Sequence, residues 1–256
     1  MTNKVTICAL ASGSNGNCYY IGNETGAILI DAGISARSLQ LRLTETELYH
    51  TGIKAILITH EHSDHCRSVR SVSKRLGNIP VYLTKDTYLA IPNKDRPSNV
   101  AWFDKNTPFS INDFSIFPFS KQHDAADACS FRIVCNEKHI GVMTDIGTVC
   151  ENVKKHFTQC HAVFLESNYD EDMLWSGSYP TYLKRRVASD YGHLSNNQSS
   201  QLAEFFAGRD LEVIFLSHIS QENNTLEKAM DAFIKLSLSC LIKPTSRFGP
   251  AEVYRL

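Results

Sequence analysis

The sequence predicts an α/β protein built as a four-layer αββα sandwich, in which helices cover the outer faces of two packed β-sheets. Strand–helix units occur toward both ends of the chain, and a strand-rich section lies between them, so strands and helices do not alternate strictly. The 256 residues include 43% hydrophobic residues, enough for a full core, and no repeat or low-complexity linker divides them. We therefore expect one domain over residues 1–256.

The first third of the chain predicts five strands and two helices. The strands are short apolar runs, and turn-rich segments such as ASGSNGN and GNETG separate the first three. We expect strands over 5–10, 18–21, 27–30, 53–59 and 81–84, and helices over about 35–48 and 64–76.

The remainder predicts a strand-rich section followed by strand–helix units. Strands are expected over 114–119, 130–135, 139–144, 162–166 and 213–217, and helices over about 149–157, 181–189, 196–207 and after residue 224. Ser195 with Gln198 predicts a capping box at the start of the third of these helices, and Asn224 with Glu227 predicts a cap for the last. The final residues, AEVYRL, predict an edge strand.

Composition excludes several classes of protein. The net charge of −1 gives no overall attraction to nucleic acid or anionic membranes, although a local basic patch is compatible with it. No apolar run approaches the ~20 residues of a membrane span, and the N-terminus lacks a signal-peptide pattern. The eight cysteines form no C-x-x-C pair and are too sparse for a disulfide scaffold. We expect a cytoplasmic protein with reduced, mostly buried cysteines and no membrane association, and the sequence leaves protein partners open.

The segment AILITHEHSDHC, residues 55–66, predicts a metal site. Its histidines and acids directly follow the apolar run Ala-Ile-Leu-Ile, which argues against a solvated polar loop. Charged groups that are buried need partners. In extended backbone His60 and His62 point the same way and can bind one ion. Asp64 and His65 lie where the chain turns into a helix, so they diverge and can reach a second ion. Imidazole with carboxylate suits zinc, manganese or iron better than magnesium or calcium.

Three later strands also end in residues that bind metals. His123, Asp145 and His218 each follow an apolar strand, which would place them at a sheet edge. Each alone would be an ordinary turn residue or cap, but beside the first motif we expect them to be ligands. Glu61 is expected to point away from the metals. The other histidines lack such a context, and we expect ordinary surface or core roles for His50, His139, His156 and His161.

The H-x-H-x-D-H motif, with single His, Asp and His residues on later strand ends, resembles the metallo-β-lactamase superfamily, whose fold is an αββα sandwich. This resemblance implies one metal held by His60, His62 and His123, and a second held by Asp64, His65 and His218. It implies that Asp145 bridges the two. The cofactors would then be two divalent ions, zinc or manganese, with iron as the alternative.

A narrower resemblance is to the YycJ (WalJ) type subfamily. It rests on the segments ASGSNGNC, ILITHEHSDH, HDAAD, TDIG, LESNYDEDML, YPTYLKRR, GHLSN and LSHISQENN. The resemblance implies a metal-dependent nuclease, with DNA as substrate and 5′-to-3′ exonuclease activity. Many superfamily members place the third ligand between glycines, whereas here His123 lies in QHDAADA. This departure argues against β-lactam hydrolysis and glyoxalase-type thioester hydrolysis.

Residues outside the ligand set are candidates for substrate contacts. His193 lies two residues before the expected cap Ser195, near a helix N-terminus that favours phosphate, although it could simply hydrogen-bond a loop. The SGSNGN segment is an ordinary tight turn or, by resemblance, a substrate loop. The basic run on the 181–189 helix is a solvated face or a phosphate contact. The candidates are Ser14, Asn15, Lys184, Arg185, Arg186 and His193.

The expected activity is hydrolysis of a phosphodiester by a hydroxide that the two metals share. Asp64 would also receive a proton from the water, and His193 would donate one to the leaving group or bind a phosphoryl oxygen. Glu166, Asn168 and Asp170 could orient ligands or cap the next helix. The alternatives are a small-molecule phosphodiesterase or other ester hydrolase on the same fold, a metal-bound regulatory protein without turnover, and an iron redox protein.

Overall fold

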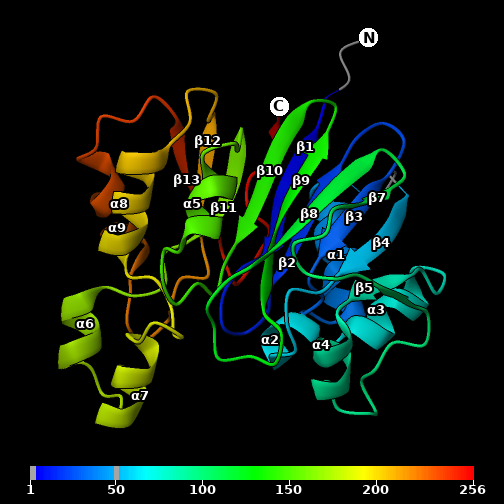
Figure 1. The fold of residues 1–256 in the computed structure, drawn as a ribbon, viewed down its shortest axis with the longest axis horizontal. Coiled ribbons are helices and arrows are strands. Elements are labelled where there is room, and N and C mark those ends of the chain that lie inside the picture. Colours follow the sequence, from blue (N-terminus) through cyan, green and yellow to red (C-terminus); the bar gives the residue numbers. More distant parts are fainter. Residues whose placement is uncertain (1–3, 49–51) are drawn as a thin grey trace.

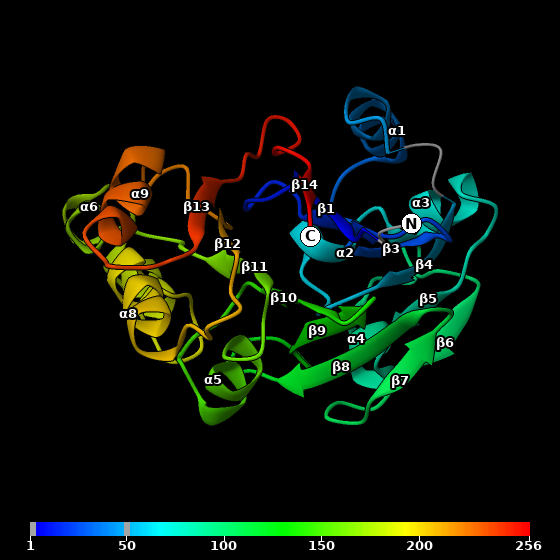
Figure 2. The same cartoon turned by 90° about the horizontal axis from the view of Figure 1, so that it is seen from above.

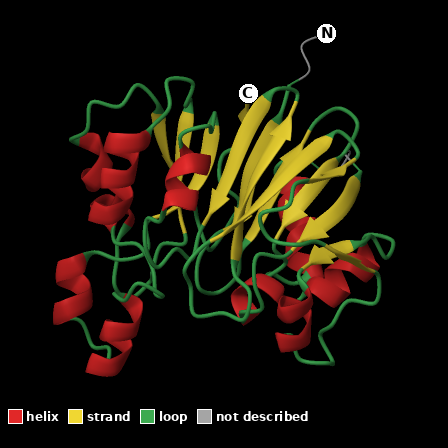
Figure 3. Cartoon of the chain, in the orientation of Figure 1, coloured by secondary structure: helices red, strands yellow, loops and turns green. Residues whose placement is uncertain are grey.

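A computed structural model describes residues 4–48 and 52–256. In this part of the chain two seven-stranded sheets pack against each other, and helices cover the outer face of each (Figures 1 and 3). The predicted four-layer sandwich is confirmed. His50 lies outside the described residues, so its expected role stays a prediction.

The first sheet combines the N-terminal strands with the last strand of the chain. Strands β14, β1, β2 and β3 pair antiparallel, and β3, β4, β5 and β6 pair parallel. The predicted C-terminal edge strand is confirmed as β14. In sheet order the strands are β14 (Tyr254–Arg255), β1 (Thr6–Ala11), β2 (Cys18–Gly22), β3 (Ala27–Ile30), β4 (Ile53–Leu57), β5 (Val81–Leu83) and β6 (Val100–Trp102).

The second sheet is formed by the strands between residues 109 and 244. Its strands β7 to β10 pair antiparallel, and β10 to β13 pair parallel. In sheet order they are β13 (Leu241–Pro244), β12 (Val213–Ser217), β11 (Ala162–Glu166), β10 (Lys138–Met143), β9 (Cys129–Cys135), β8 (Phe114–Ser120) and β7 (Phe109–Ile111).

The main core lies between the two sheets. Alternate side chains of both sheets face it, and the Tyr19 ring on β2 lies 4.9 Å from the Phe164 ring on β11. Helices α1 and α3 pack on the first sheet and α5, α8 and α9 on the second (Figure 2). The helices are α1 (Ala36–Glu45), α2 (Ser63–Cys66), α3 (Val69–Arg75), α4 (Lys85–Ala90), α5 (Glu151–Phe157), α6 (Glu171–Ser176), α7 (Thr181–Val187), α8 (Asn196–Phe206) and α9 (Leu226–Ile234).

Two helix predictions were wrong in detail. The helix expected over 64–76 is broken into α2 and α3, because Ser68 leaves the helical conformation and donates its N–H to the Ala32 carbonyl. The cap of α9 is Thr225, whose Oγ1 accepts from the Lys228 N–H at 3.1 Å. Asn224 does not cap it, because its buried Oδ1 accepts from Asn196 Nδ2 and from the Thr225 N–H, each at 2.9 Å, instead of from the first turn of α9. The capping box of Ser195 and Gln198 is confirmed.

The sequence also missed α4, β6, β7 and β13, which are all short. An element of three to six residues carries too few positions for a periodic pattern to show. These elements lie at or near sheet margins, and the site is built elsewhere.

The carboxyl ends of the parallel strands gather at one end of the sandwich. The segments that follow β3, β4, β10, β11 and β12 all emerge there (Figure 1). Three residues in these segments, Asp31, Asp145 and His218, have positive φ angles of 65°, 55° and 56°. Non-glycine residues in this region are strained and cluster at functional sites. This end of the molecule is therefore where a site is expected.

Candidate metal centre

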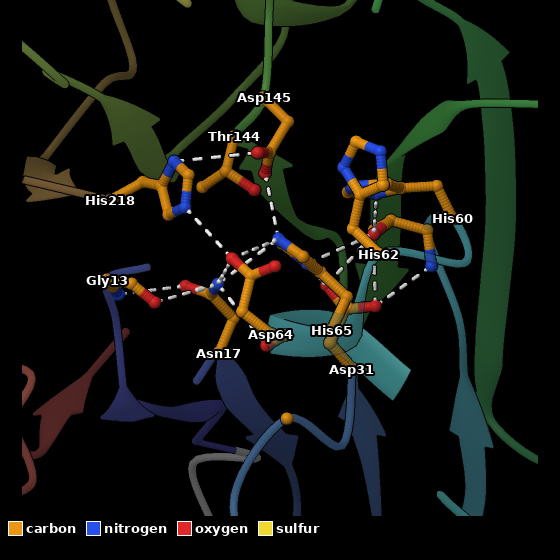
Figure 4. A network of polar contacts seen from close by, with 12 residues as sticks. Gly13, Asn17, Asp31, His60, His62, Asp64, His65, Thr144, Asp145 and His218 are labelled. Carbon is orange, nitrogen blue, oxygen red and sulfur yellow. Dashed lines mark hydrogen bonds and ion pairs between the residues drawn. The ribbon is translucent and has the colours of Figure 1, made fainter. Parts of the chain in front are cut away.

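Seven side chains that the sequence predicts as ligands converge at this end of the sandwich. Figure 4 labels each of them except His123. Four of them come from the segment after β4, and one each follows β8, β10 and β12. Each belongs to at least one group whose ligand atoms lie within 4.8 Å of one another. They are His60, His62, Asp64, His65, His123, Asp145 and His218.

The first group contains three histidines. His62 Nδ1 lies 3.1 Å from His60 Nε2 and 3.3 Å from His123 Nε2. Burial lowers the pKa of His60 well below its ordinary value and that of His123 to about 4. Metals bind the neutral form of imidazole. Three imidazole nitrogens that face one another, two of them on rings kept neutral, fit a transition metal.

The second group contains a carboxylate and two histidines. Asp64 Oδ2 lies 3.4 Å from both His65 Nε2 and His218 Nε2. Burial acts to lower the pKa of His218, but Asp145, Asp64 and Glu166 outweigh it and raise this pKa to about 10. For the carboxyl group of Asp64 burial acts in the opposite direction and would raise the pKa, but His65 and His218 hold this pKa well below its ordinary value. Surrounding carboxylates thus keep both histidines of this group protonated, and a bound cation would displace these protons.

Asp145 faces both groups. Its Oδ2 lies 3.2 Å from His65 Nε2, and its Oδ1 lies 3.7 Å from His123 Nε2 and 3.5 Å from His218 Nδ1. Among the described residues, its buried Oδ2 accepts no hydrogen bond. A buried carboxylate oxygen in this state leaves a position for a cation. The residues present thus fit a metal centre, with Asp145 between the two groups.

Outer hydrogen bonds fix the histidine rings. His60 donates through Nδ1 to Thr59 Oγ1 at 2.9 Å, and His123 donates through Nδ1 to the Gly192 carbonyl at 3.0 Å. His65 donates through Nδ1 to Asp31 Oδ2 at 2.7 Å, and His218 to Glu166 Oε1 at 2.9 Å. All four rings therefore present Nε2 inward, which is the usual way that outer partners set metal ligands.

The sequence analysis missed Asp31 and Asn17. Asp31 is fully buried and also accepts from the Thr59 N–H at 2.9 Å, so it links the ends of β3 and β4. Asn17 donates through Nδ2 to the Gly13 carbonyl at 3.1 Å and to Asp64 Oδ2 at 3.3 Å. The only signal for Asp31 was a lone acid after an apolar strand, and none pointed to Asn17.

We expect Asp31→Asn to weaken metal binding by about 10- to 100-fold, because an amide stabilises the His65 imidazole less than a carboxylate does. Competition for Zn²⁺ with a chromophoric chelator measures this affinity. Asp113→Asn is the matched control, since Asp113 is bonded to Thr25 at 2.6 Å and contacts none of the ligands. Equal affinities in the two variants would contradict the prediction.

Glu166 connects the metal groups to His193. This buried carboxylate accepts from the Nδ1 atoms of His193 and His218, each at 2.9 Å, and from the N–H groups of residues 145, 146 and 194. Burial acts to raise the pKa of Glu166, but His193 and His218 lower it to about 2. Its oxygens are occupied by five donors, so it acts as an outer partner that orients His193 toward the site.

A pocket of about 220 Å³ opens onto this centre. Of the predicted substrate residues, Ser14, Arg186 and His193 line it. Asn15 does not, and its carbonyl accepts from the Arg67 guanidinium. Lys184 and Arg185 also lie outside the lining, and the Lys184 ammonium donates to the Trp175 carbonyl at 2.7 Å. Asn168 lines the pocket, whereas Asp170 caps α6.

The residues for which we expected no part in metal binding lie apart from the ligand groups. Glu61 turns to the loop after His123 and accepts from the Ala126 N–H at 2.8 Å. His139 and His156 accept from the guanidinium of Arg132, which is a buried residue. Among the described residues, no group able to hold a metal includes His139, His156 or His161.

We expect His156 to make the protein less stable in mild acid. Burial and the cations Arg132 and Lys155 lower its pKa from 6.5 to about 4, whereas the unfolded chain binds this proton near 6.5. The unfolded state therefore holds more protons between these values, and stability present above pH 6.5 is lost as the pH falls toward 4. Compared with His156→Gln, the wild type should lose about 1 kcal/mol more between pH 7.5 and pH 5, allowing for partial exposure.

Urea unfolding at the two pH values measures this difference. Titration of the ligand groups and loss of metal occur in both proteins, so these effects cancel in the comparison. Parallel pH profiles of the two proteins would contradict the prediction.

Comparison with known proteins gives a family and a fold. The family model described as beta-lactamase superfamily domain matches residues 27–219. Exodeoxyribonuclease YycJ of Bacillus anthracis is 32% identical over 253 residues, covering 96% of this chain and 92% of that protein. Exodeoxyribonuclease WalJ of Streptococcus pneumoniae is 33% identical over 225 residues, covering 86% and 83%.

Solved structures agree in fold. The metallo-beta-lactamase fold protein YhfI from Bacillus subtilis has a TM-score of 0.73 at 13% identity, with both chains fully covered. Zn²⁺-bound PqqB from Methylobacterium extorquens has a TM-score of 0.70 at 14% identity, covering 98% of this chain and all of that one. In the described residues, no helix combines the length and apolar character needed to span a bilayer.

Proposed function

The chain belongs to the beta-lactamase superfamily, in the YycJ (WalJ) type subfamily, and we propose that this hydrolase is a dinuclear metal-dependent phosphodiesterase acting on DNA. The observation that carries the proposal is the position of Asp145 between two ligand groups, beside a pocket that also exposes His193 and Arg186. The names of the relatives support DNA as the substrate and an exonuclease mode of action.

The residues proposed to hold the metals form two groups of three, as the distances between their ligand atoms suggest, with one residue between the groups. His60, His62 and His123 would hold one ion, Asp64, His65 and His218 the other, and Asp145 would bridge them. Zinc or manganese suits these donors, with iron as the alternative. When bound, the ions would supply a water of lowered pKa as nucleophile and positive charge for the phosphoryl oxygens.

His193 is proposed to act as the general acid. Its Nδ1 is held by Glu166, and its ring lines the pocket, so Nε2 is free to serve a substrate there. As the bond between phosphorus and the leaving oxygen breaks and a bond to the oxygen of water forms, His193 gives its proton to the leaving oxygen. Asp64 is proposed to take a proton from the attacking water.

Substrate contacts are proposed for the cations and polar groups near the pocket. Arg186 lies on the lining and would bind a phosphoryl oxygen, and Ser14, also on the lining, would contact the substrate. Asn15, Lys184 and Arg185 lie farther out, where they would contact phosphates of a longer strand. Because these cations are local and the net charge is −1, DNA binding should weaken strongly as salt is raised.

The deciding experiment uses duplex DNA labelled at either the 5′ or the 3′ end. The protein is loaded separately with Mn²⁺ and Zn²⁺, and Asp64→Ala is assayed beside it. Release of labelled mononucleotide from the 5′ end first, absent in the variant, would support a 5′-to-3′ exonuclease.

The small pocket makes a small-molecule phosphodiesterase the second candidate. Intact DNA together with hydrolysis of bis(p-nitrophenyl) phosphate would favour it. No hydrolysis of either substrate with either metal would contradict both.

A further inference from the structure

Part of the pocket lining is apolar. This part consists of Tyr179, Leu183 and Val187, at and just before helix α7, and Val187 is next in sequence to the lining residue Arg186. The rest of the lining is polar or charged and includes residues of the candidate metal centre. A pocket lined by both kinds of side chain matches the two parts of a nucleotide, its phosphate and its base.

The size of the pocket limits what can enter. At about 220 Å³ it lies below the ~300–1,000 Å³ typical of ligand pockets. A base pair is larger than this space. An end whose terminal base enters the pocket must therefore be unpaired, and unpairing costs free energy unless the end is already single-stranded.

Each of the helices α6 and α7 carries an exposed aromatic side chain. Tyr182 is 74% exposed and lies one helical turn before Arg186, so both side chains occupy one face of α7. Trp175 on α6 is 52% exposed. Lys184 and Arg185 add positive charge to the same helix. Aromatic rings interleaved with cations are the usual platform for single-stranded nucleic acid.

Helices α6 and α7 are firmly attached to the rest of the protein. Arg186 Nε lies 2.5 Å from Asp124 Oδ2, and Asp124 directly follows the proposed ligand His123. Beneath α6 and α7, Leu174 and Val187 pack with Tyr169 in a small core of their own. Helices α6 and α7 lie below α8 and α9, at the end of the molecule where the strand ends gather (Figure 1).

We propose that α6 and α7 (residues 171–187) form a single-strand platform that selects unpaired DNA ends. The terminal nucleotide enters the pocket with its base against Tyr179, Leu183 and Val187, and Tyr182 stacks on the base of the next nucleotide. This inference rests on the proposed nuclease function and adds to it the class of substrate, a frayed or single-stranded end.

The test compares Tyr182→Ala and the conservative Tyr182→Phe with a control, Phe205→Ala. Phe205 on α8 is an equally exposed aromatic residue, 71%, outside the pocket lining. Three substrates are used: a blunt duplex, the same duplex with five mismatched terminal pairs, and bis(p-nitrophenyl) phosphate. Binding is followed separately by the fluorescence of 2-aminopurine placed next to the terminal nucleotide of a phosphorothioate oligonucleotide, because stacking quenches it.

The wild type should prefer the frayed to the blunt duplex by at least about tenfold in kcat/KM. Tyr182→Ala should raise KM for the frayed end by about tenfold, in line with the loss of one stacked base, and should reduce the quenching. Tyr182→Phe and Phe205→Ala should behave as the wild type.

Equal rates on frayed and blunt ends, or identical behaviour of Tyr182→Ala and Phe205→Ala, would overturn the inference while leaving the nuclease function standing. Hydrolysis of the small diester without any hydrolysis of DNA would overturn both.

Discussion

Asp145→Asn is expected to abolish hydrolysis of both DNA and small phosphodiesters. The carboxylate faces both ligand groups, with oxygens 3.2 Å from His65 Nε2 and 3.7 Å from His123 Nε2. An amide of the same shape lacks the charge needed to hold two cations beside each other. The rate should therefore fall by more than the ~10- to 100-fold expected for loss of an outer partner. Bound metal, measured by mass spectrometry after dialysis, should fall below two ions per chain.

The variant must be shown to be folded, because Asp145 also balances the charge of buried histidines in the metal-free protein. Breaking a buried ion pair costs about 3–5 kcal/mol, so thermal unfolding is recorded for the metal-free and loaded proteins. Asp113→Asn again serves as the control. Two bound ions and normal turnover in Asp145→Asn would show that this residue does not bridge the metals.

His193→Ala is expected to lower kcat on DNA by about 10²- to 10⁴-fold, the usual contribution of a general acid. The decrease should be much smaller for bis(p-nitrophenyl) phosphate, because p-nitrophenolate leaves without needing a proton. Metal content should not change, since His193 donates its Nδ1 proton to Glu166 at 2.9 Å and is not among the proposed ligands. The ratio of the two rates in wild type and variant measures the effect.

Two other outcomes would assign His193 differently. Equal losses on both substrates would indicate binding of a phosphoryl oxygen in place of proton donation. A loss of bound metal would make His193 a ligand, since its Nδ1 lies 3.8 Å from Asp145 Oδ1.

The ligand groups could be anticipated because their signal is local or falls at a recognisable place. His60, His62, Asp64 and His65 lie within six residues, and Asp145 and His218 follow strands that apolar runs reveal. The order of the strands in each sheet then brings these ends together. The two sheets and their helical layers were anticipated from the order of the strand-rich and strand–helix sections together with the family resemblance, since hydrophobic periodicity by itself identifies elements and not their layers.

The outer partners could not be anticipated in the same way. Asn17 contacts Asp64 across 47 residues, and Asp31 contacts His65 across 34, so only the folded chain shows these pairs. On α7, the run Lys184–Arg186 looked uniform in sequence, but the helix turns only Arg186 into the pocket lining. Neighbouring helical residues point about 100° apart, and which one faces a site depends on how the helix docks.

Each ligand group takes two side chains from the segment after β4 in the first sheet and one from a segment that follows a strand of the second sheet. The first group joins His60 and His62 to His123, and the second joins Asp64 and His65 to His218. An ion held by either group would thus fasten the two layers, and any opening that parts them must first release it. In the metal-loaded protein, amide groups deep in the core between the sheets, far from the pocket, should accordingly exchange more slowly. The free energy of the opening that permits exchange should rise by the free energy of ion binding. The concentration of the metal ion would then determine how long the protein resists proteolysis as well as how fast it turns over substrate.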